Sequence, residues 1–340
     1  MAEEIMNVWD DNLEAEFDNI MQLVEKYNYI SMDTEFPGIC MQGEHLIGYN
    51  FIKSNVDELK LIQVGITLAD ENGETPKPIS TWQFNLKFDL EQDSHAKESI
   101  NLLKEAGIDF DQLNQRGADT MRFADLLVSS GLVLNEDTHW ITFHGAFDFG
   151  YLMKAISNCK LPPTLDKFNL TAKMYFPCIY DLKILINEVP ELKSGSLAKL
   201  SHDLDVKRSG MQHQAGSDAL LTLACFFKIR QTYFKNGVPR KATNRIFGLN
   251  AEYQQPFTPS QQSTATFASN LEKQQQAMAQ QPAYQNVFYP HQAPASNFYT
   301  YPMDVQSYYM NQFDMPGMIF NATPTAMMAM NSPYKLNGKQ

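Results

Sequence analysis

The segment YISMDTEFPG, residues 29–38, places two carboxylates within a run of apolar and aromatic residues. Strand-forming residues followed by a Pro-Gly pair predict a β-strand over residues 29–36. Alternate strand residues share a face, so Asp33 and Glu35 project together near the carboxyl end, with Thr34 on the other side. An exposed strand end usually explains such a pair, but the core-like neighbours favour a partly desolvated position. Like charges there raise each other's pKa unless a cation separates them, and their oxygens suit Mg²⁺ or Mn²⁺.

The hydrophobic periodicity of the chain predicts an α/β fold. Three strands come before the first internal helix, and helices and strands alternate afterwards. This order favours a mixed sheet with helices packed on it over a purely parallel sheet. The expected strands cover residues 29–36, 59–70, 81–88 and 139–145. The expected helices cover residues 8–27, 94–107, 121–131, 147–158, 181–189, 196–206 and 217–234.

The composition changes near residue 250. Residues 251–340 are rich in Gln, Pro, Asn, Tyr and Met, contain only 4 acidic and 3 basic residues, and show no sustained period of 2 or 3.6. Such a segment is typical of low-complexity, disordered chain. We therefore expect a folded domain over residues 1–250 and a disordered tail over 251–340. A dispensable extension and a partner-binding segment both fit this tail.

The whole chain of 340 residues carries a net charge of −12, whereas nucleic-acid-binding proteins usually present a basic face. Bound metal cations could supply the missing positive charge. The four cysteines are scattered without a CxxC pair, which favours a reducing compartment over a zinc site or disulfides. The acidic start has no apolar signal-peptide core, and no apolar run reaches the length of a membrane span. We expect a cytoplasmic protein, with a nuclear location also open, and no membrane partner.

Further carboxylates lie at two expected element boundaries. Asp148, in FHGAFDFGYL, falls where a strand passes into a helix. Ligand sites favour strand ends in α/β sheets, although the helix dipole alone also favours an acid there. In HQAGSDALL, Ser217 is the expected N-cap of the last helix. That assignment places Asp218 in the first turn and His213 in the preceding loop.

Together these residues provide what phosphodiester hydrolysis needs. Four carboxylates can hold two divalent cations about 4 Å apart, which stabilise the attacking and leaving oxygens of phosphoryl transfer. A neutral histidine nearby can accept a proton from the attacking water. Three other polar residues have simpler explanations: His144 as a core histidine, Cys178 as a buried thiol, and Asp181 as the N-cap of the helix over 181–189 rather than an active-site acid.

The ordered set Asp33, Glu35, Asp148, His213 and Asp218 resembles the histidine-containing branch of the DEDD exonuclease superfamily. The flanking sequence resembles the Caf/Pop-type deadenylase subunit of the carbon-catabolite-repression/Not complex. This resemblance runs from about residue 8 to residue 249 and is carried by VWDDNL, YNYISMDTEFPG, NVDELKLIQVGITL, TWQFNLKF, FHGAFDFGYL, FPCIYDLK and HQAGSDALLT.

The resemblance implies an RNase H-like fold and 3′-to-5′ exoribonuclease action on poly(A) tails, with two divalent metal ions, Mg²⁺ or Mn²⁺, and release of 5′-AMP. It makes the four acids the metal ligands, and His213 the group that orients or deprotonates water. The implied partners are poly(A) RNA, the large Not scaffold, a second, unrelated deadenylase and, in animals, BTG/Tob-type regulators. The chain departs from the family pattern in having Phe147 where a tyrosine usually precedes the acid, and in a short segment between Pro37 and Asn55.

Two other functions fit part of the pattern. A DEDD exonuclease without poly(A) preference would use the same chemistry with a different base pocket. An RNase H-like scaffold subunit without catalysis would usually have lost one or more of the acids, and all five residues are present here.

Overall fold

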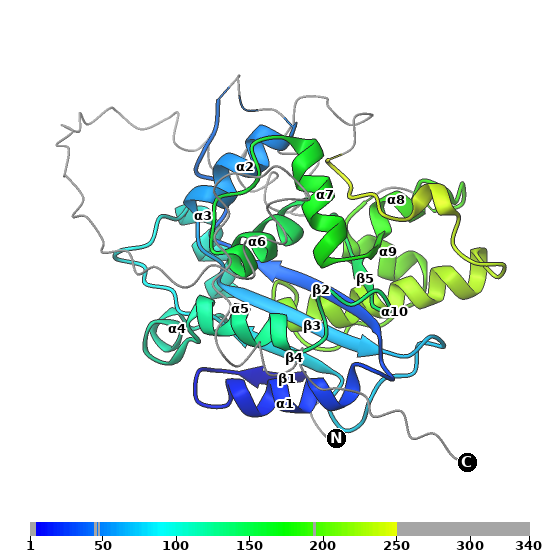
Figure 1. Cartoon of the computed structure of the whole chain (residues 1–340), viewed down its shortest axis with the longest axis horizontal. Helices are drawn as coiled ribbons and strands as arrows, with labels where there is room; N and C mark the ends of the chain where they lie inside the picture. Colours follow the sequence, from blue (N-terminus) through cyan, green and yellow to red (C-terminus); the bar gives the residue numbers. More distant parts are fainter. Residues whose placement is uncertain (1–4, 44–45, 47, 193–194, 250–340) are drawn as a thin grey trace, which may run out of the picture.

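A mixed sheet of six strands forms the centre of the protein (Figure 1). The computed structural model describes residues 5–43, 46, 48–192 and 195–249. The expected tail over 251–340 lies outside the described residues, so the proposed domain boundary near residue 250 stays a prediction. Within the described part, no helix combines the length and apolar character needed to cross a bilayer.

The strands lie side by side in the order β1-β4-β3-β2-β5-β6. β3 runs antiparallel to both β2 and β4, and the pairs β1–β4, β2–β5 and β5–β6 are parallel. This topology confirms the prediction of a mixed α/β sheet. The strands are β1 (Ile5–Val8), β2 (Tyr29–Glu35), β3 (Gln63–Ala69), β4 (Thr81–Asn85), β5 (His139–Thr142) and β6 (Cys178–Asp181).

Helices cover both faces of the sheet (Figure 1). In chain order they are α1 (Leu13–Leu23), α2 (Gly48–Glu58), α3 (Lys97–Glu105), α4 (Phe110–Arg116), α5 (Thr120–Ser129), α6 (Ala146–Ser157), α7 (Leu165–Tyr175), α8 (Leu182–Ile186), α9 (Leu197–Asp203) and α10 (Ala215–Tyr233), followed by the short 3-10 helix η1 (Arg240–Ala242). The fold is thus a three-layer arrangement in which the strands lie between two groups of helices.

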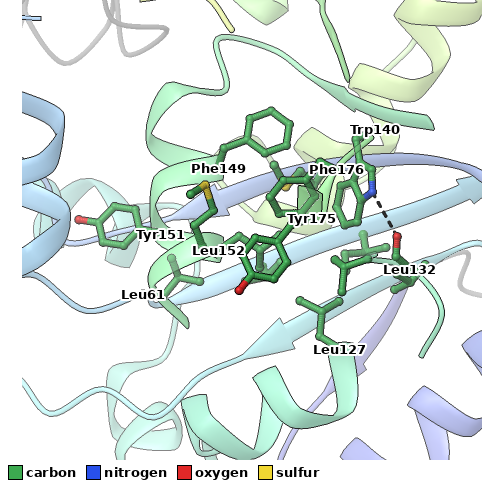
Figure 2. Packing of buried hydrophobic residues seen from close by; sticks show 14 of the residues in the cluster. Leu61, Leu127, Leu132, Trp140, Phe149, Tyr151, Leu152, Tyr175 and Phe176 are labelled. Atoms are coloured by element: carbon green, nitrogen blue, oxygen red, sulfur yellow. Dashed lines mark hydrogen bonds between the residues drawn. The ribbon is translucent and has the colours of Figure 1, made fainter. Parts of the chain in front are cut away.

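The two faces of β2 contribute to different hydrophobic clusters. Met32 belongs to a cluster formed with α1, α2, α5, α6 and α7. Figure 2 shows part of it, where the buried indole of Trp140 donates a hydrogen bond to the carbonyl oxygen of Leu132 at 3.2 Å. The opposite face, to which Tyr29 belongs, packs on the cluster of α8, α9 and α10. β2 therefore lies in the middle of the sheet with helices against both of its faces.

Several expected elements differ from the observed ones. The expected helix over 8–27 is shorter than expected and forms α1. The edge strand β1, which was not expected, precedes it, because residues 5–8 pair in parallel with β4. The expectation that three strands come before the first internal helix is wrong, since α2 lies between β2 and β3. β6, α4 and α7 were also not expected. These segments have only four to eleven residues. β6 pairs with β5, and α4 and α7 pack into hydrophobic clusters formed with other parts of the chain.

Gly65 allows the close approach of α10 to the sheet. It pairs with Asp33 across β2 and β3, and a Cβ atom at Gly65 would lie 2.0 Å from the carbonyl oxygen of Ala215. That oxygen belongs to the backbone of the first residue of α10, so a side chain at position 65 would displace the start of the helix.

We therefore expect Gly65→Ala to lower the free energy of unfolding by roughly 1–3 kcal/mol, the usual cost of overpacking. If Mn²⁺ binds the acids named in the sequence analysis, we expect it to raise the melting temperature, and Gly65→Ala should reduce that rise because the first turn of α10 carries Asp218. Val64→Ala, on the opposite face of β3, is the control: it should destabilise the core by roughly 2 kcal/mol and keep the Mn²⁺ effect. An unchanged response to Mn²⁺ in Gly65→Ala would contradict this account.

Candidate active site

β2 directs Asp33 and Glu35 toward α10. Ser31, two residues before Asp33 and therefore on the same face, donates its hydroxyl hydrogen bond to the carbonyl oxygen of Ala219 in α10 at 2.7 Å. Both carboxylates are partly exposed and line a cavity at the carboxyl end of the strand. Asp33 and Glu35 thus lie on the same face of β2, as the strand geometry predicted.

Asp218 and His213 come to the same cavity from the start of α10. Asp218 lies in the first turn, as expected, and is 7 % exposed. Its Oδ2 accepts a hydrogen bond from the backbone N–H of His213 at 2.9 Å. The ligand atoms of Glu35, His213 and Asp218 all lie within 4.8 Å of one another. Glu35 of β2 thus lies beside two residues from the start of α10, close enough together for a cation to be held among them.

The expected cap of α10 is wrong. The helix begins at Ala215 with Gln214 at the N-cap position, and Ser217 lies inside the first turn. The hydroxyl of Ser217 donates instead to the carbonyl oxygen of Ser209 at 2.7 Å. Ser217 therefore ties the preceding loop, which leads to His213, to the start of the helix.

Asp148 reaches the site from the other helical layer. It lies in the first turn of α6 and is 7 % exposed. Its Oδ1 accepts a hydrogen bond of 2.6 Å from the hydroxyl of Thr34, the residue between the two acids of β2. Because Thr34 points to the opposite face of the strand, β2 holds Asp148 from one face and presents Asp33 and Glu35 on the other.

Asp181 fixes the turn that leads to Asp148. The expected N-cap role is confirmed, since Oδ1 accepts from the N–H of Lys183 at 2.9 Å. The same fully buried carboxylate also accepts from the backbone N–H groups of His144, Gly145 and Phe247, at 2.9–3.0 Å. The sequence did not indicate this wider role. Asp181 thus determines where α6 begins.

His144 and Cys178 differ in how well they match expectation. The imidazole of His144 is buried as expected, and burial lowers its pKa to about 3, so the ring is neutral. It also lines the cavity, which was not expected. Cys178 is only partly buried, although burial still raises the pKa of its thiol. A thiol with a raised pKa is a poor nucleophile.

The electrostatics of the site call for cations. Burial raises the pKa of Asp33 and Glu35 well above the usual range, and the neighbouring charges of Asp218 and Asp148 raise both further. Burial also raises the pKa of Asp148 to about 7, partly offset by the hydrogen bond from Thr34. Keeping these acids ionised together requires positive charge among them, and carboxylate oxygens are the ligands that Mg²⁺ and Mn²⁺ prefer. The residues present therefore fit divalent cations.

The rest of the cavity is mostly apolar. Its lining includes the aromatic pair Phe36 and Phe147, whose rings stack with centroids 5.1 Å apart. Phe147 has no hydroxyl group to offer a substrate at this position, and its buried ring packs on the neighbouring aromatic rings. Further apolar residues on the wall are Ile39, Leu102, Leu103, Phe143 and Leu197.

Sequence reasoning missed Arg208, which lines the same cavity. Its Nη1 donates to Asp218 Oδ1 at 2.7 Å. A basic residue five positions before His213, in an otherwise acidic chain, was the available signal.

The fold and the site together define a nuclease of the DEDD exonuclease class with an RNase H-like architecture. The sequence matches the family described as CAF1 family ribonuclease over residues 8–125 and 120–226. The chain therefore belongs to the CAF1 ribonuclease family and is a hydrolase.

Relatives of known name agree with this assignment. Poly(A) ribonuclease pop2 of Schizosaccharomyces pombe is 43% identical over 253 residues, covering 73% of this chain and 75% of its own. A structure of S. pombe Pop2p with Mg²⁺ and Mn²⁺ bound has a TM-score of 0.70 at 43% identity and covers 72% of this chain and 100% of that one. A structure of the yeast NOT1 MIF4G domain with CAF1 has a TM-score of 0.62 at 33% identity, over 72% and 96% of the two chains.

The raised pKa of Asp148 makes stability depend on pH in the metal-free protein. Its folded-state pKa of about 7 exceeds the ordinary value of 3.8, so the folded protein binds a proton that the unfolded chain releases. The resulting stabilisation is complete below the ordinary value and is lost as pH rises through about 7.

We therefore expect the wild-type protein in EDTA to lose more unfolding free energy between pH 5 and pH 8 than Asp148→Asn does. A difference of one bound proton between the folded and unfolded states changes the free energy of unfolding by at most about 1.4 kcal/mol per pH unit. Denaturant unfolding at four pH values measures the difference, with Asp18→Asn, an exposed acid of α1, as control. The same pH slope in wild type and Asp148→Asn would show that Asp148 is ionised throughout.

Proposed function

We propose that the protein is a poly(A)-specific 3′-to-5′ exoribonuclease that shortens mRNA tails and releases 5′-AMP. The observation that carries this proposal is the convergence of Asp33, Glu35, Asp148, Asp218 and His213 on one cavity. The name of the S. pombe relative, a poly(A) ribonuclease, supports the choice of substrate. The Mg²⁺ and Mn²⁺ bound to S. pombe Pop2p support the use of two divalent cations of this kind.

In the proposed mechanism the four acids hold the cations. When bound, two such cations supply positive charge at the attacking and leaving oxygens of phosphoryl transfer. Asp33 and Glu35 approach from β2, Asp218 from α10 and Asp148 from α6, so the ligands are fixed on regular elements rather than on mobile loops. Rigid placement reduces the reorganisation needed as charge develops on the phosphate.

His213 is the proposed general base. Burial lowers the pKa of its imidazole, so the ring is neutral near pH 7 and can accept a proton from the attacking water. The hydrogen bond from its backbone N–H to Asp218 keeps it beside the acid cluster. His213 also has a left-handed backbone conformation, with φ of 62°, which a well-defined loop must maintain.

The apolar wall of the cavity suits a single-stranded substrate. Unstacked bases of single-stranded RNA gain free energy by packing on aromatic side chains. Phe36 is partly exposed, lines the cavity beside Glu35, and stacks on Phe147 and Tyr151, so the exposed part of its ring is the proposed packing surface for a base. Stacking accepts any base, so poly(A) preference is the part of the proposal that most needs a direct test.

We extend the proposal to assembly and location. The structure of yeast CAF1 with the NOT1 MIF4G domain supports docking of this chain on a Not scaffold. The family resemblance alone supports three further points. The protein would work beside a second deadenylase and would be regulated by BTG/Tob-type proteins. It would be located in the cytoplasm, including mRNA-decay bodies, with a share in the nucleus. Affinity purification of the tagged protein followed by mass spectrometry, together with fluorescence imaging, tests these points; absence of Not scaffold from the purified material would contradict the assembly.

The decisive assay is a time course on a 5′-labelled RNA that has a mixed-sequence body and a 3′ run of A, with Mg²⁺ or Mn²⁺. We expect stepwise shortening that slows at the first non-A residues. Asp33→Asn should lower the rate by roughly 100-fold or more, the scale of losing one preorganised electrostatic group. Asp18→Asn, which changes charge equally at an exposed site, should behave as wild type.

The outcomes separate the competing functions. Shortening that ignores base identity would indicate a DEDD exonuclease without poly(A) preference. No shortening by folded protein with either metal would indicate a scaffold subunit. Equal rates in wild type and Asp33→Asn would place the chemistry elsewhere.

A further inference from the structure

Arg208 contacts the acid cluster directly. Its guanidinium Nη1 lies 2.7 Å from Asp218 Oδ1 and 3.1 Å from the hydroxyl oxygen of Ser217. The side chain is 19% exposed, and among the described residues that line the cavity no other arginine and no lysine occurs. Because Ser217 is itself bound to Ser209, Arg208 is held by the first turn of α10 and the loop before it.

Both oxygens of Asp218 are engaged by groups of the chain. The backbone N–H of His213 binds Oδ2, and Arg208 binds Oδ1. A cation that uses Oδ1 would therefore lie close to the guanidinium. A divalent ion and a guanidinium on one carboxylate oxygen repel each other, and the low exposure of this site limits screening by solvent.

The same contact has a second consequence for the acids of β2. The positive charge of Arg208 opposes the repulsion that Asp33 and Glu35 experience from Asp218 and Asp148. Among the described residues that line the cavity, Arg208 is thus the basic side chain whose charge offsets the negative charge of the acids in the absence of metal.

We propose that Arg208 is a positioning residue that takes the place of a divalent cation at Asp218 in the metal-free protein and competes with the cation for that carboxylate. The proposal rests on metal use by the acid cluster, a part of the proposed function, but not on poly(A) preference. Arg208 thereby stabilises the empty site and sets how much cation is needed to fill it.

The test measures cation binding and stability rather than RNA cleavage. We expect Arg208→Gln to melt at a lower temperature than wild type in EDTA, because the acids lose their counter-charge. At low ionic strength its Mn²⁺ dissociation constant should fall by roughly tenfold, the effect of removing one nearby positive charge. Free Mn²⁺ in a titration is counted by electron paramagnetic resonance. The Mn²⁺-induced rise in melting temperature should be larger than in wild type.

Two variants serve as controls. Arg240→Gln makes the same change in net charge at an exposed position outside the cavity and should bind Mn²⁺ as wild type does. Arg208→Lys keeps the charge but carries it on a compact ammonium group with a different reach and donor geometry from the planar guanidinium, so its Mn²⁺ affinity should fall between those of wild type and Arg208→Gln. If Arg208→Gln does not fold, Arg208→Lys still tests the proposal.

An unchanged or weaker Mn²⁺ affinity in the folded Arg208 variants would overturn the proposal, because Arg208 would then support metal binding rather than compete with it. Wild-type protein that binds no Mn²⁺ would overturn both this inference and the metal-dependent function. A loss of poly(A) preference alone would leave the Mn²⁺ result intact.

Discussion

Repulsion among four acidic side chains at the carboxyl end of β2 is the constraint on which the site depends. Asp33, Glu35, Asp148 and Asp218 converge on one cavity. Burial raises the pKa of the first three, and the charges of Asp218 and Asp148 raise the pKa of Asp33 and Glu35 further. A chain would not gain stability by gathering these groups in a poorly solvated place without a compensating charge. The arrangement makes physical sense when cations occupy it, and Arg208 offsets part of the repulsion when they do not.

The fold meets this constraint by using both faces of a central strand. β2 lies between two helical layers, so one face directs Asp33 and Glu35 to α10 while Thr34, on the other face, binds Asp148 of α6. Gly65 lets α10 approach closely enough for Asp218 to join them. Asp181, in turn, anchors the turn before α6 by accepting hydrogen bonds from the backbone N–H groups of His144 and Gly145. It also accepts from Lys183 and Phe247, which ties the turn to other parts of the chain. Contacts of residues outside the acid cluster, those of Gly65 and Asp181, thus help to position the four acids.

Local chemistry could be predicted from the sequence, and long-range contacts could not. The spacing of Asp33 and Glu35 follows from strand geometry, and the helix-start position of Asp218 follows from the sequence around it. The edge strand β1 and the strand β6 depend on pairing with remote residues, so their short segments carry no sufficient signal of their own. Serine is a preferred N-cap residue, but the hydroxyl of Ser217 donates its hydrogen bond to the carbonyl oxygen of Ser209 instead. The role of Arg208 required knowing that its loop folds back on α10.

Anomalous X-ray diffraction from crystals of the protein grown with Mn²⁺ tests the central claim most directly. The account predicts two Mn²⁺ peaks about 4 Å apart, ligated by oxygens of Asp33, Glu35, Asp148 and Asp218. It also predicts that the Arg208 guanidinium has moved away from Asp218. No Mn²⁺ peak among these four acids, at a concentration that saturates binding in solution, would contradict the claim that the acid cluster exists to hold divalent cations.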